Sequence, residues 1–292
     1  MKKLIVAGLG IAMIASMAFD AAAKQKYVQV KGSDTLINMM QKLAEVYMAE
    51  NPGKAVSVTG GGSGTGIASI INGTADIANA SRLMKDKEIQ QAVQNNVNPV
   101  RVVVALDSLC IVVNPNNPVQ QLTVEDIAKI YRGEVANWKE VGGEDLKISL
   151  YGRQPNSGTY DFMKDDILKS DYSPKMRQMN GNAQIIEAIK ADRSAVGYVG
   201  VGYAKEAGGI GVAKVAAKVG GTYYDPFNTE DVKNGNYPIT RPLQQYINGQ
   251  AAGDVKEFIQ FELSPKGQEI VEKEGFFAIP EEYKDVNKKA GL

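Results

Sequence analysis

The sequence contains no histidine and only one cysteine among its 292 residues. Without histidine there is no Ser-His-Asp or Cys-His relay, no imidazole general base, and no histidine ligand for zinc or haem. The single cysteine, Cys110, allows no intrachain disulfide and no thiolate cluster. The chemistry must therefore come from hydroxyl groups, carboxylates, lysine, arginine and backbone amides, and we expect neither a metal site nor a cofactor.

An excess of charge of either sign is also lacking, because 33 Lys and Arg residues balance 33 Asp and Glu residues. A net charge of zero argues against broad, non-specific binding of nucleic acid or of an anionic membrane surface. The hydrophobic content of 44% and charged content of 23% are ordinary for a globular protein. The length suits one large domain or two medium domains.

The first residues have the pattern of a secretory signal peptide. A pair of lysines precedes the apolar run 4–19, which is shorter than the ~20 residues that a membrane-spanning helix needs. Small residues follow at 21–23, the pattern at which signal peptidase cuts. We predict a signal peptide over residues 1–23 and a soluble, exported mature protein; the alternative is an uncleaved anchor helix. Cys110 lies too far from this cut to carry the lipid of a lipoprotein.

Strand-like and helix-like segments alternate along the rest of the chain. The expected strands are 27–31, 55–59, 76–81, 146–151, 195–199 and 239–247, and the expected helices are 36–51, 67–71, 85–95, 123–132, 158–168, 182–191, 254–262 and 265–274. This βαβ order predicts an α/β fold with a mainly parallel sheet that helices cover on both faces.

The β-rich run 100–113 is longer than a typical strand of ~5–6 residues. We interpret it as two strands joined at 106–108, where the chain crosses from one α/β domain to another and from which it returns near 238. Domain I is then 24–106 plus 238–292, and domain II is 107–237. Residues 205–237 look looped, and the polar tail after Glu281 is expected to be loosely held.

Two loops that join a strand to a helix have the composition of an anion site. In the first, Gly32-Ser33-Asp34-Thr35, a side chain can cap the helix while the remaining N–H groups and the helix dipole attract an anion. The alternative is a plain N-cap. The second, 60–66, has five glycines in seven residues. It lacks the spacing of a dinucleotide or P-loop motif, so amides and the Ser63 hydroxyl aimed at a small anion fit it better than a flexible turn.

A third loop, 152–159, also lies between a strand and a helix. Arg153 supplies a fixed fork of donors suited to tetrahedral oxyanions, and Ser157, Gly158 and Thr159 stand where the helix begins, near its positive end. The same pattern also occurs in ordinary turns.

Arg82 directly follows the strand 76–81 and would, in isolation, be interpreted as a solvated arginine. In open α/β sheets, however, ligands bind beyond the carboxyl ends of the strands, where Arg82 and all three loops are placed. We therefore expect these residues to meet in a cleft between the two domains.

The order of these segments resembles the phosphate-binding protein of bacterial ABC phosphate transporters, in the type II periplasmic binding protein family. The similarity runs through nearly the whole mature chain, in the segments 32–35, 60–66, 75–82, 122–138, 152–159, 196–198, 237–243 and 261–265.

The resemblance implies a periplasmic, bilobed and monomeric protein whose lobes close on one inorganic phosphate and deliver it to an inner-membrane ABC phosphate permease. Carried over by position, the implied phosphate ligands are Thr35, the Leu36 amide, Ser63, Arg153, Ser157, Gly158 and Thr159. Their position at the carboxyl ends of strands adds Ser33 and Arg82 to the expected ligands.

Two positions depart from other members of the family, some of which have Asp where this chain has Arg82 and Pro155. The first change removes a proton acceptor, and the second removes a carboxylate that could hold Arg153.

Selectivity depends on a proton acceptor, because phosphate carries a proton at neutral pH and sulfate does not. A buried carboxylate would pair with that proton and would reject sulfate by ~1–3 kcal/mol or more. Asp107 is our candidate for this role and Asp34 the second; the alternative for Asp107 is an exposed turn residue. We expect Asp107→Asn to weaken phosphate binding and to relax the rejection of sulfate, both measured by calorimetry.

Three other functions remain open. A serine hydrolase is disfavoured because the chain has no Ser-x-x-Lys and no histidine to serve as a base, so we predict that the protein is not an enzyme. Glycine loops and helix ends also suit sulfate, molybdate and tungstate. An exported protein that senses or scavenges phosphate without a transporter would share all of these features.

Overall fold

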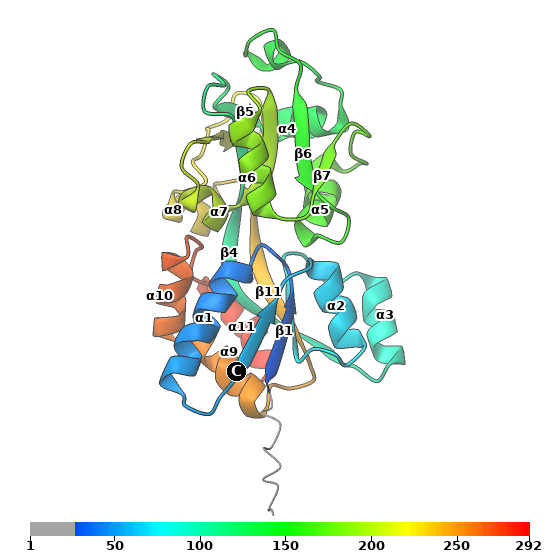
Figure 1. The fold of residues 1–292 in the computed structure, drawn as a ribbon, viewed down its shortest axis with the longest axis vertical. Coiled ribbons are helices and arrows are strands. Elements are labelled where there is room, and N and C mark those ends of the chain that lie inside the picture. Colours follow the sequence, from blue (N-terminus) through cyan, green and yellow to red (C-terminus); the bar gives the residue numbers. More distant parts are fainter. Residues whose placement is uncertain (1–26) are drawn as a thin grey trace, which may run out of the picture.

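The computed structural model describes residues 27–292, which form two lobes joined by two long strands (Figure 1). The predicted signal peptide lies outside the described residues. Among the helices formed by residues 27–292, none combines the length and the hydrophobicity needed to cross a bilayer. The predicted two-domain α/β fold is confirmed.

The secondary structure follows the predicted alternation closely. The strands are β1 (Val28–Gly32), β2 (Val56–Thr59), β3 (Ile77–Ala80), β4 (Pro99–Val113), β5 (Gln121–Thr123), β6 (Ser149–Arg153), β7 (Arg177–Met179), β8 (Ala195–Gly200), β9 (Gly211–Val212), β10 (Lys214–Ala216) and β11 (Thr240–Asn248). The α-helices are α1 (Ile37–Glu50), α2 (Ser63–Ile71), α3 (Asp86–Gln94), α4 (Val124–Arg132), α5 (Gly158–Phe162), α6 (Asn182–Ala191), α7 (Val201–Glu206), α8 (Thr229–Lys233), α9 (Gly253–Leu263), α10 (Pro265–Lys273) and α11 (Lys284–Lys289). Short 3₁₀ segments lie at Trp138–Val141 and Glu281–Tyr283, and a π-helical turn at Met163–Leu168 continues α5.

The strands lie in the order β2-β1-β3-β11-β4-β8-β6-β7. In the lower lobe of Figure 1, β1 is parallel to β2 and β3, while β11 is antiparallel to β3 and β4. In the upper lobe β6 is parallel to β7 and β8, and β8 is antiparallel to β4. Each lobe therefore has parallel strands whose carboxyl ends point toward the junction, and one antiparallel partner that connects it to the other lobe.

The long run around residue 107 is one strand, and the prediction of two strands was wrong. β4 pairs with β11 as far as Ser108 and with β8 from Leu109 onward, so it changes partner without a break in its backbone. The polar residues Asp107 and Ser108, which we interpreted as a joint, are fully buried and find partners inside the protein. Because their side chains are satisfied in extended conformation, no turn is needed.

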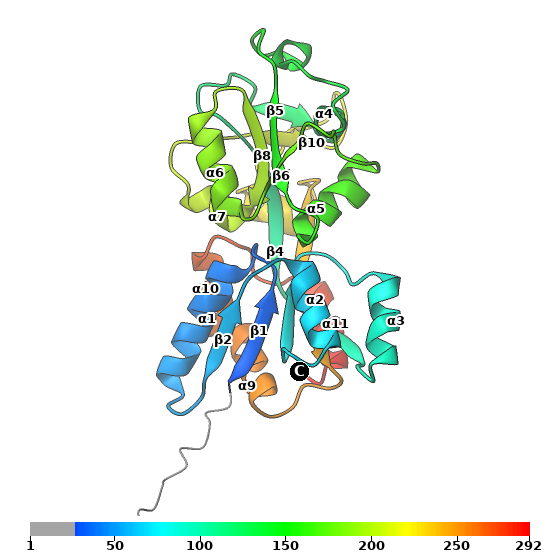
Figure 2. The same cartoon turned by 45° about the vertical axis from the view of Figure 1, so that its right-hand side comes forward.

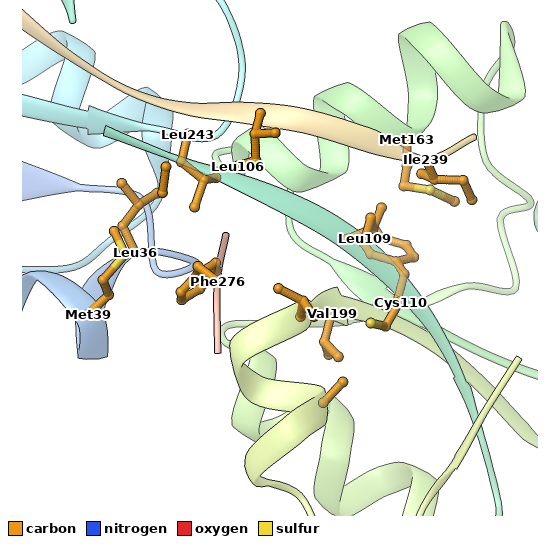
Figure 3. Close-up of a cluster of buried hydrophobic side chains, with 14 of the residues drawn as sticks. Leu36, Met39, Leu106, Leu109, Cys110, Met163, Val199, Ile239, Leu243 and Phe276 are labelled. Carbon is orange, nitrogen blue, oxygen red and sulfur yellow. The ribbon is translucent and has the colours of Figure 1, made fainter. Parts of the chain in front are cut away.

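Apolar side chains from both lobes pack along β4 (Figure 3). Leu36 and Met39, of the lower lobe in Figure 1, lie on the left of Figure 3, and Leu109, Cys110 and Val199, of the upper lobe, lie farther right. Burial raises the pKa of the Cys110 thiol well above its usual range. The lone cysteine therefore behaves as a small apolar side chain and not as a nucleophile.

The C-terminal tail is packed against the lower lobe, so the expectation that it is loosely held was wrong. Asn287, in α11, accepts a hydrogen bond from the N–H of Val103 and donates one to its C=O, at 2.8 and 2.9 Å. In this lobe β4 is the edge of the sheet, and the asparagine amide takes the place of a neighbouring strand. The segment 205–237, predicted to be looped, likewise contains β9, β10 and α8.

Candidate functional site

The three predicted loops meet at the junction of the lobes, where α5 lies above α2 (Figure 2). The N–H of Gly64 donates to the C=O of Asn156 at 3.0 Å, and the Asn156 side chain donates to the C=O of Gly61 at 2.8 Å. Glycine is required here because a Cβ on Gly62 would lie 2.5 Å from the Asn156 carbonyl oxygen. The glycine loop therefore allows the two backbones to approach each other, and its predicted contact with an anion stays a prediction.

Five buried hydroxyl side chains gather at this junction, and we call them the hydroxyl cluster: Ser33, Thr35, Ser63, Ser81 and Thr159. Ser81 Oγ lies 3.0 Å from Ser33 Oγ and 3.3 Å from Ser63 Oγ. Thr35 Oγ1 and Thr159 Oγ1 lie 3.0 Å apart, and this contact joins the lower lobe to the upper one.

The start of α5 packs on the hydroxyl cluster. A Cβ on Gly158 would lie 2.3 Å from Ser63 Oγ, so this position has no room for a side chain. Ser157 is the N-cap of α5, and its Oγ accepts from the N–H of Thr159 at 3.2 Å. The Leu36 amide, a predicted ligand, donates to the Ser33 C=O at 3.2 Å within the turn that precedes α1.

Arg153 is buried at the end of β6 with part of its hydrogen-bonding capacity unused. Its Nη2 donates to Asp34 Oδ2 at 2.5 Å and to the C=O of Asn180 at 3.0 Å. Within residues 27–292 its Nε and Nη1 are buried and have no hydrogen-bond partner. Asp34 also accepts from the N–H of Gly61 at 2.8 Å. Asp34, from the opposite lobe, thus supplies the carboxylate that holds Arg153, because the proline at position 155 has none.

Arg82 contacts carboxylates at the edge of the junction, and its role as a phosphate ligand stays a prediction. Its Nη1 and Nη2 donate to the two oxygens of Glu88, each at 2.7 Å, and its Nε lies 2.8 Å from Asp161 Oδ2 of the upper lobe. Burial alone would raise the pKa of Glu88, but the hydrogen bonds from Arg82 hold it below its usual range. This arginine therefore forms ion pairs within its own lobe and across the junction.

Asp107 is fully buried, which excludes the alternative of an exposed turn residue. Its Oδ1 accepts from the N–H of Val201 at 2.9 Å, and its Oδ2 accepts from Arg241 Nε and Nη2 at 3.0 and 2.8 Å. Both oxygens therefore have donors already, and a role as the acceptor of a ligand's proton stays a prediction.

Sequence reasoning missed Ser81 and Arg241 as members of this site. Ser81 stands beside Arg82 at the carboxyl end of β3, so the argument that selected Arg82 applied to it equally. Arg241 lies in β11, far along the chain, and only its place in the segment 237–243 marked it. Tyr203 was also missed; its hydroxyl donates to the Asp34 C=O at 3.0 Å, and burial raises its pKa to about 12.

This arrangement offers hydrogen-bond donors in a place shielded from water. Hydroxyl and guanidinium groups in such a setting make strong, charge-assisted hydrogen bonds to an anion. The hydrogen-bond partners of Ser33, Ser63 and Ser81 include no histidine, lysine or free carboxylate that could act as a base. Residues 27–292 contain no group of three acidic or cysteine side chains able to hold a metal ion.

The chain is similar over most of its length to a known protein family. A family model described as the PBP superfamily domain matches residues 19–266. The phosphate-binding protein PstS of Pseudomonas aeruginosa is 31% identical over 267 residues, covering 85% of this chain and 82% of that protein. PstS of Borreliella burgdorferi is 32% identical over 264 residues, covering 87% of this chain and 91% of that one.

Two solved structures have the same fold. A substrate-binding protein from Clostridium perfringens with bound phosphate superposes with a TM-score of 0.78 at 28% identity. The match covers 87% of this chain and 100% of that one. An ABC-type phosphate transport receptor from Vibrio cholerae superposes with a TM-score of 0.70 at 29% identity, with the same coverage of 87% and 100%.

Proposed function

Because this chain belongs to the PBP superfamily, in the family of phosphate-binding proteins of ABC transporters, we propose that it captures inorganic phosphate between its lobes and delivers it to an ABC-type phosphate importer. The observation that carries the proposal is Arg153, whose buried Nε and Nη1 have no partner within residues 27–292. A tetrahedral oxyanion is the ligand that such a fork of donors binds best.

The proposed ligand set draws on both lobes. From the lower lobe it takes Ser33, Thr35, the Leu36 amide and Ser63, and from the upper lobe Arg153, Ser157, Gly158 and Thr159. The contact between Thr35 and Thr159 supports this set because it brings the two halves together. Arg82 and Asp107 act beside the ligand, through the ion pairs described above.

The mechanism is reversible closure. An anion that contacts donors from both lobes stabilises the closed state, since only there do all of its hydrogen bonds form. The importer then recognises surfaces of both lobes that are correctly aligned only in the closed form. No enzymatic step is needed, because the hydroxyl groups serve as donors and not as nucleophiles.

We extend the proposal to the domains and the location of the protein. The domain boundaries, 24–106 plus 238–292 and 107–237, are supported by the change of partner in β4 after Ser108 and by the start of β11 at Thr240. Export to the periplasm, through cleavage of residues 1–23, is supported by the lysine pair and the apolar run at the start of the sequence. The monomeric state is part of the proposal and follows from the family resemblance.

Calorimetric titration and thermal unfolding with phosphate, arsenate, sulfate and molybdate test this function. We expect phosphate, and arsenate with the same shape and protonation, to bind and to raise the melting temperature, and sulfate and molybdate to have little effect. A shift with sulfate and none with phosphate would show that the protein binds a different oxyanion. Ester substrates added to the same preparation should show no turnover.

A further inference from the structure

Arg241 is a buried arginine for which neither the fold nor the predicted ligand set accounts. It projects from β11, one of the two strands that join the lobes, and its side chain is 3% exposed. Its guanidinium makes four hydrogen bonds to three acceptors: two to Asp107 Oδ2, one to the C=O of Ser81 at 3.1 Å, and one to Thr159 Oγ1 at 3.0 Å. Its Cζ also lies 5.0 Å from the centre of the Phe162 ring.

These contacts connect three separate parts of the site. Ser81 belongs to the lower lobe, Thr159 to the upper lobe, and Asp107 to the strand that passes between them. A guanidinium can serve all three because its five N–H groups are fixed in one plane, whereas the ammonium group of lysine is a single point of charge. The position therefore requires arginine specifically.

The contact with Thr159 determines which way its hydroxyl group points. A guanidinium can only donate, so Thr159 Oγ1 is the acceptor of the bond from Arg241. The hydroxyl hydrogen of Thr159 must then be directed elsewhere, toward Thr35 Oγ1 at 3.0 Å or toward a bound anion. Either way, the positive charge of Arg241 makes this hydroxyl a stronger donor, because hydrogen bonds in a chain polarise one another.

We propose that Arg241, held in place by Asp107, is a positioning residue that orients and polarises the Thr159 hydroxyl so that it donates to the bound oxyanion. This inference rests on the proposed function. Asp107 fixes the direction of the guanidinium and balances its charge. The Thr159 hydroxyl is thereby oriented as a donor, while the Asp107–Arg241 pair adds no net charge to the hydroxyl cluster. Arg241 acts through Thr159 and is not itself a ligand.

A double-mutant cycle with inorganic phosphate tests this role, with Arg241→Lys introduced into the wild type, Thr159→Ser and Thr159→Val. Lysine keeps a charge for Asp107 but cannot reach all three partners. We expect Arg241→Lys to weaken phosphate binding about tenfold, or ~1.4 kcal/mol, in the wild type and in Thr159→Ser, which retains the hydroxyl. In Thr159→Val, where there is no hydroxyl to polarise, it should change binding less than about twofold.

The matched control is Arg101→Lys, because Arg101 lies on β4 and, among residues 27–292, its side chain makes one hydrogen bond, from Nε to Gln244 Oε1. It should change phosphate binding less than about twofold in every background.

Should Arg241→Lys not fold, Asp107→Asn replaces it in the same cycle, since it keeps Arg241 but removes the carboxylate that directs the guanidinium. The same loss in all three backgrounds, or no loss in any, would overturn the proposal. A wild-type protein that binds no phosphate would overturn the proposed function first, and the inference with it.

Discussion

Two arginines at the junction differ in how many of their donors are satisfied, and this difference separates ligand binding from positioning. Arg241 has an acceptor for each of its three nitrogens, whereas Arg153 has acceptors for Nη2 alone within the described part of the chain. Leaving buried donors unpaired costs ~1–3 kcal/mol each. We expect unpaired buried donors at a site where a bound ligand supplies their acceptors.

Arg153→Gln should therefore weaken phosphate binding about 100-fold or more, because two charge-assisted hydrogen bonds of ~1.5–3 kcal/mol each are lost. Calorimetry measures the effect. The matched control is Arg177→Gln, an arginine of the same lobe that stacks on Tyr151 away from the hydroxyl cluster, and it should bind phosphate as the wild type does. Equal losses in the two variants would show that Arg153 acts on the fold of the lobe and not on the ligand.

Glu262 is a second residue whose surroundings set a testable property. It is fully buried in α9, its Oε1 accepts from Gln245 Nε2 at 3.1 Å, and burial raises its pKa to about 8. The unfolded chain has a glutamate pKa of ~4.3, so between the two values the folded protein holds a proton that the unfolded chain has lost. Stability must therefore fall as pH rises from about 5 to 8, by about 1.4 kcal/mol per unit from this group, and level off above.

Glu262→Gln should remove this component of the pH dependence and be more stable than the wild type near pH 8. Denaturant unfolding at pH 5, 6, 7 and 8 measures it. Glu257→Gln, at an exposed position of the same helix, should run parallel to the wild type. Parallel curves for Glu262→Gln as well would show that Glu262 is ionised in the folded protein.

At the scale of elements, the position of α5 depends on the absence of a side chain at its first residue. Gly158 has no Cβ, and this allows α5 to approach Ser63 and Ser81 of the opposite lobe. The close contact is between lobes and not within one, so a side chain at this position opposes closure without disturbing the core of either lobe.

Gly158→Ala should accordingly weaken phosphate binding by about tenfold or more while the melting temperature of the ligand-free protein changes little. Gly181→Ala is the matched control, since Gly181 precedes α6 in the same lobe and a Cβ there would meet nothing within 4 Å. Thermal unfolding with and without phosphate distinguishes the two effects. A large loss of stability in the ligand-free Gly158→Ala protein would contradict this account.

The elements themselves were largely predictable, and the reason is local. Apolar residues recur with the period of a helix in α1 and of buried strands in β1 and β3, and glycine or proline ends most segments. The predictions that failed depended on distant partners. Nothing near Asp107 in the sequence shows that Arg241 satisfies it, and nothing near Asn287 shows that β4 exposes an edge to it.

The candidate site was predictable in the same limited way. Loops at the carboxyl ends of parallel strands must share one edge of a sheet, so Ser33, Ser63 and Arg153 were found from order alone. Which donors are left for a ligand is a property of the complete three-dimensional set of contacts. Arg82 and Arg153 look alike in sequence, but two carboxylates form ion pairs with the first and only one contacts the second.

At the scale of the whole molecule, the Arg82–Asp161 pair joins the lobes outside the hydroxyl cluster. The two side chains are 9% and 10% exposed, so water screens their attraction less than that of a surface pair. Lys85 also reaches Asp161, at 3.0 Å, but its own side chain is 49% exposed.

Asp161→Asn should favour the open arrangement, and we expect phosphate to dissociate about fivefold faster or more, measured by stopped-flow. The radius of gyration of the phosphate-free protein should also increase in small-angle X-ray scattering. Lys85→Ala, which removes the exposed partner, should change the dissociation rate less than about twofold. An unchanged rate in Asp161→Asn would show that the pair does not contribute to closure.

The unbroken course of β4 constrains how the two lobes move mechanically. Its hydrogen bonds pass from β11 to β8 with no interruption at the junction, so the strand is held in the sheet of each lobe and is continuous between them. Movement of one lobe against the other must therefore twist β4, because its backbone runs from one lobe into the other. We expect the resistance of the strand to twisting to limit how far the lobes open and to favour return to one alignment.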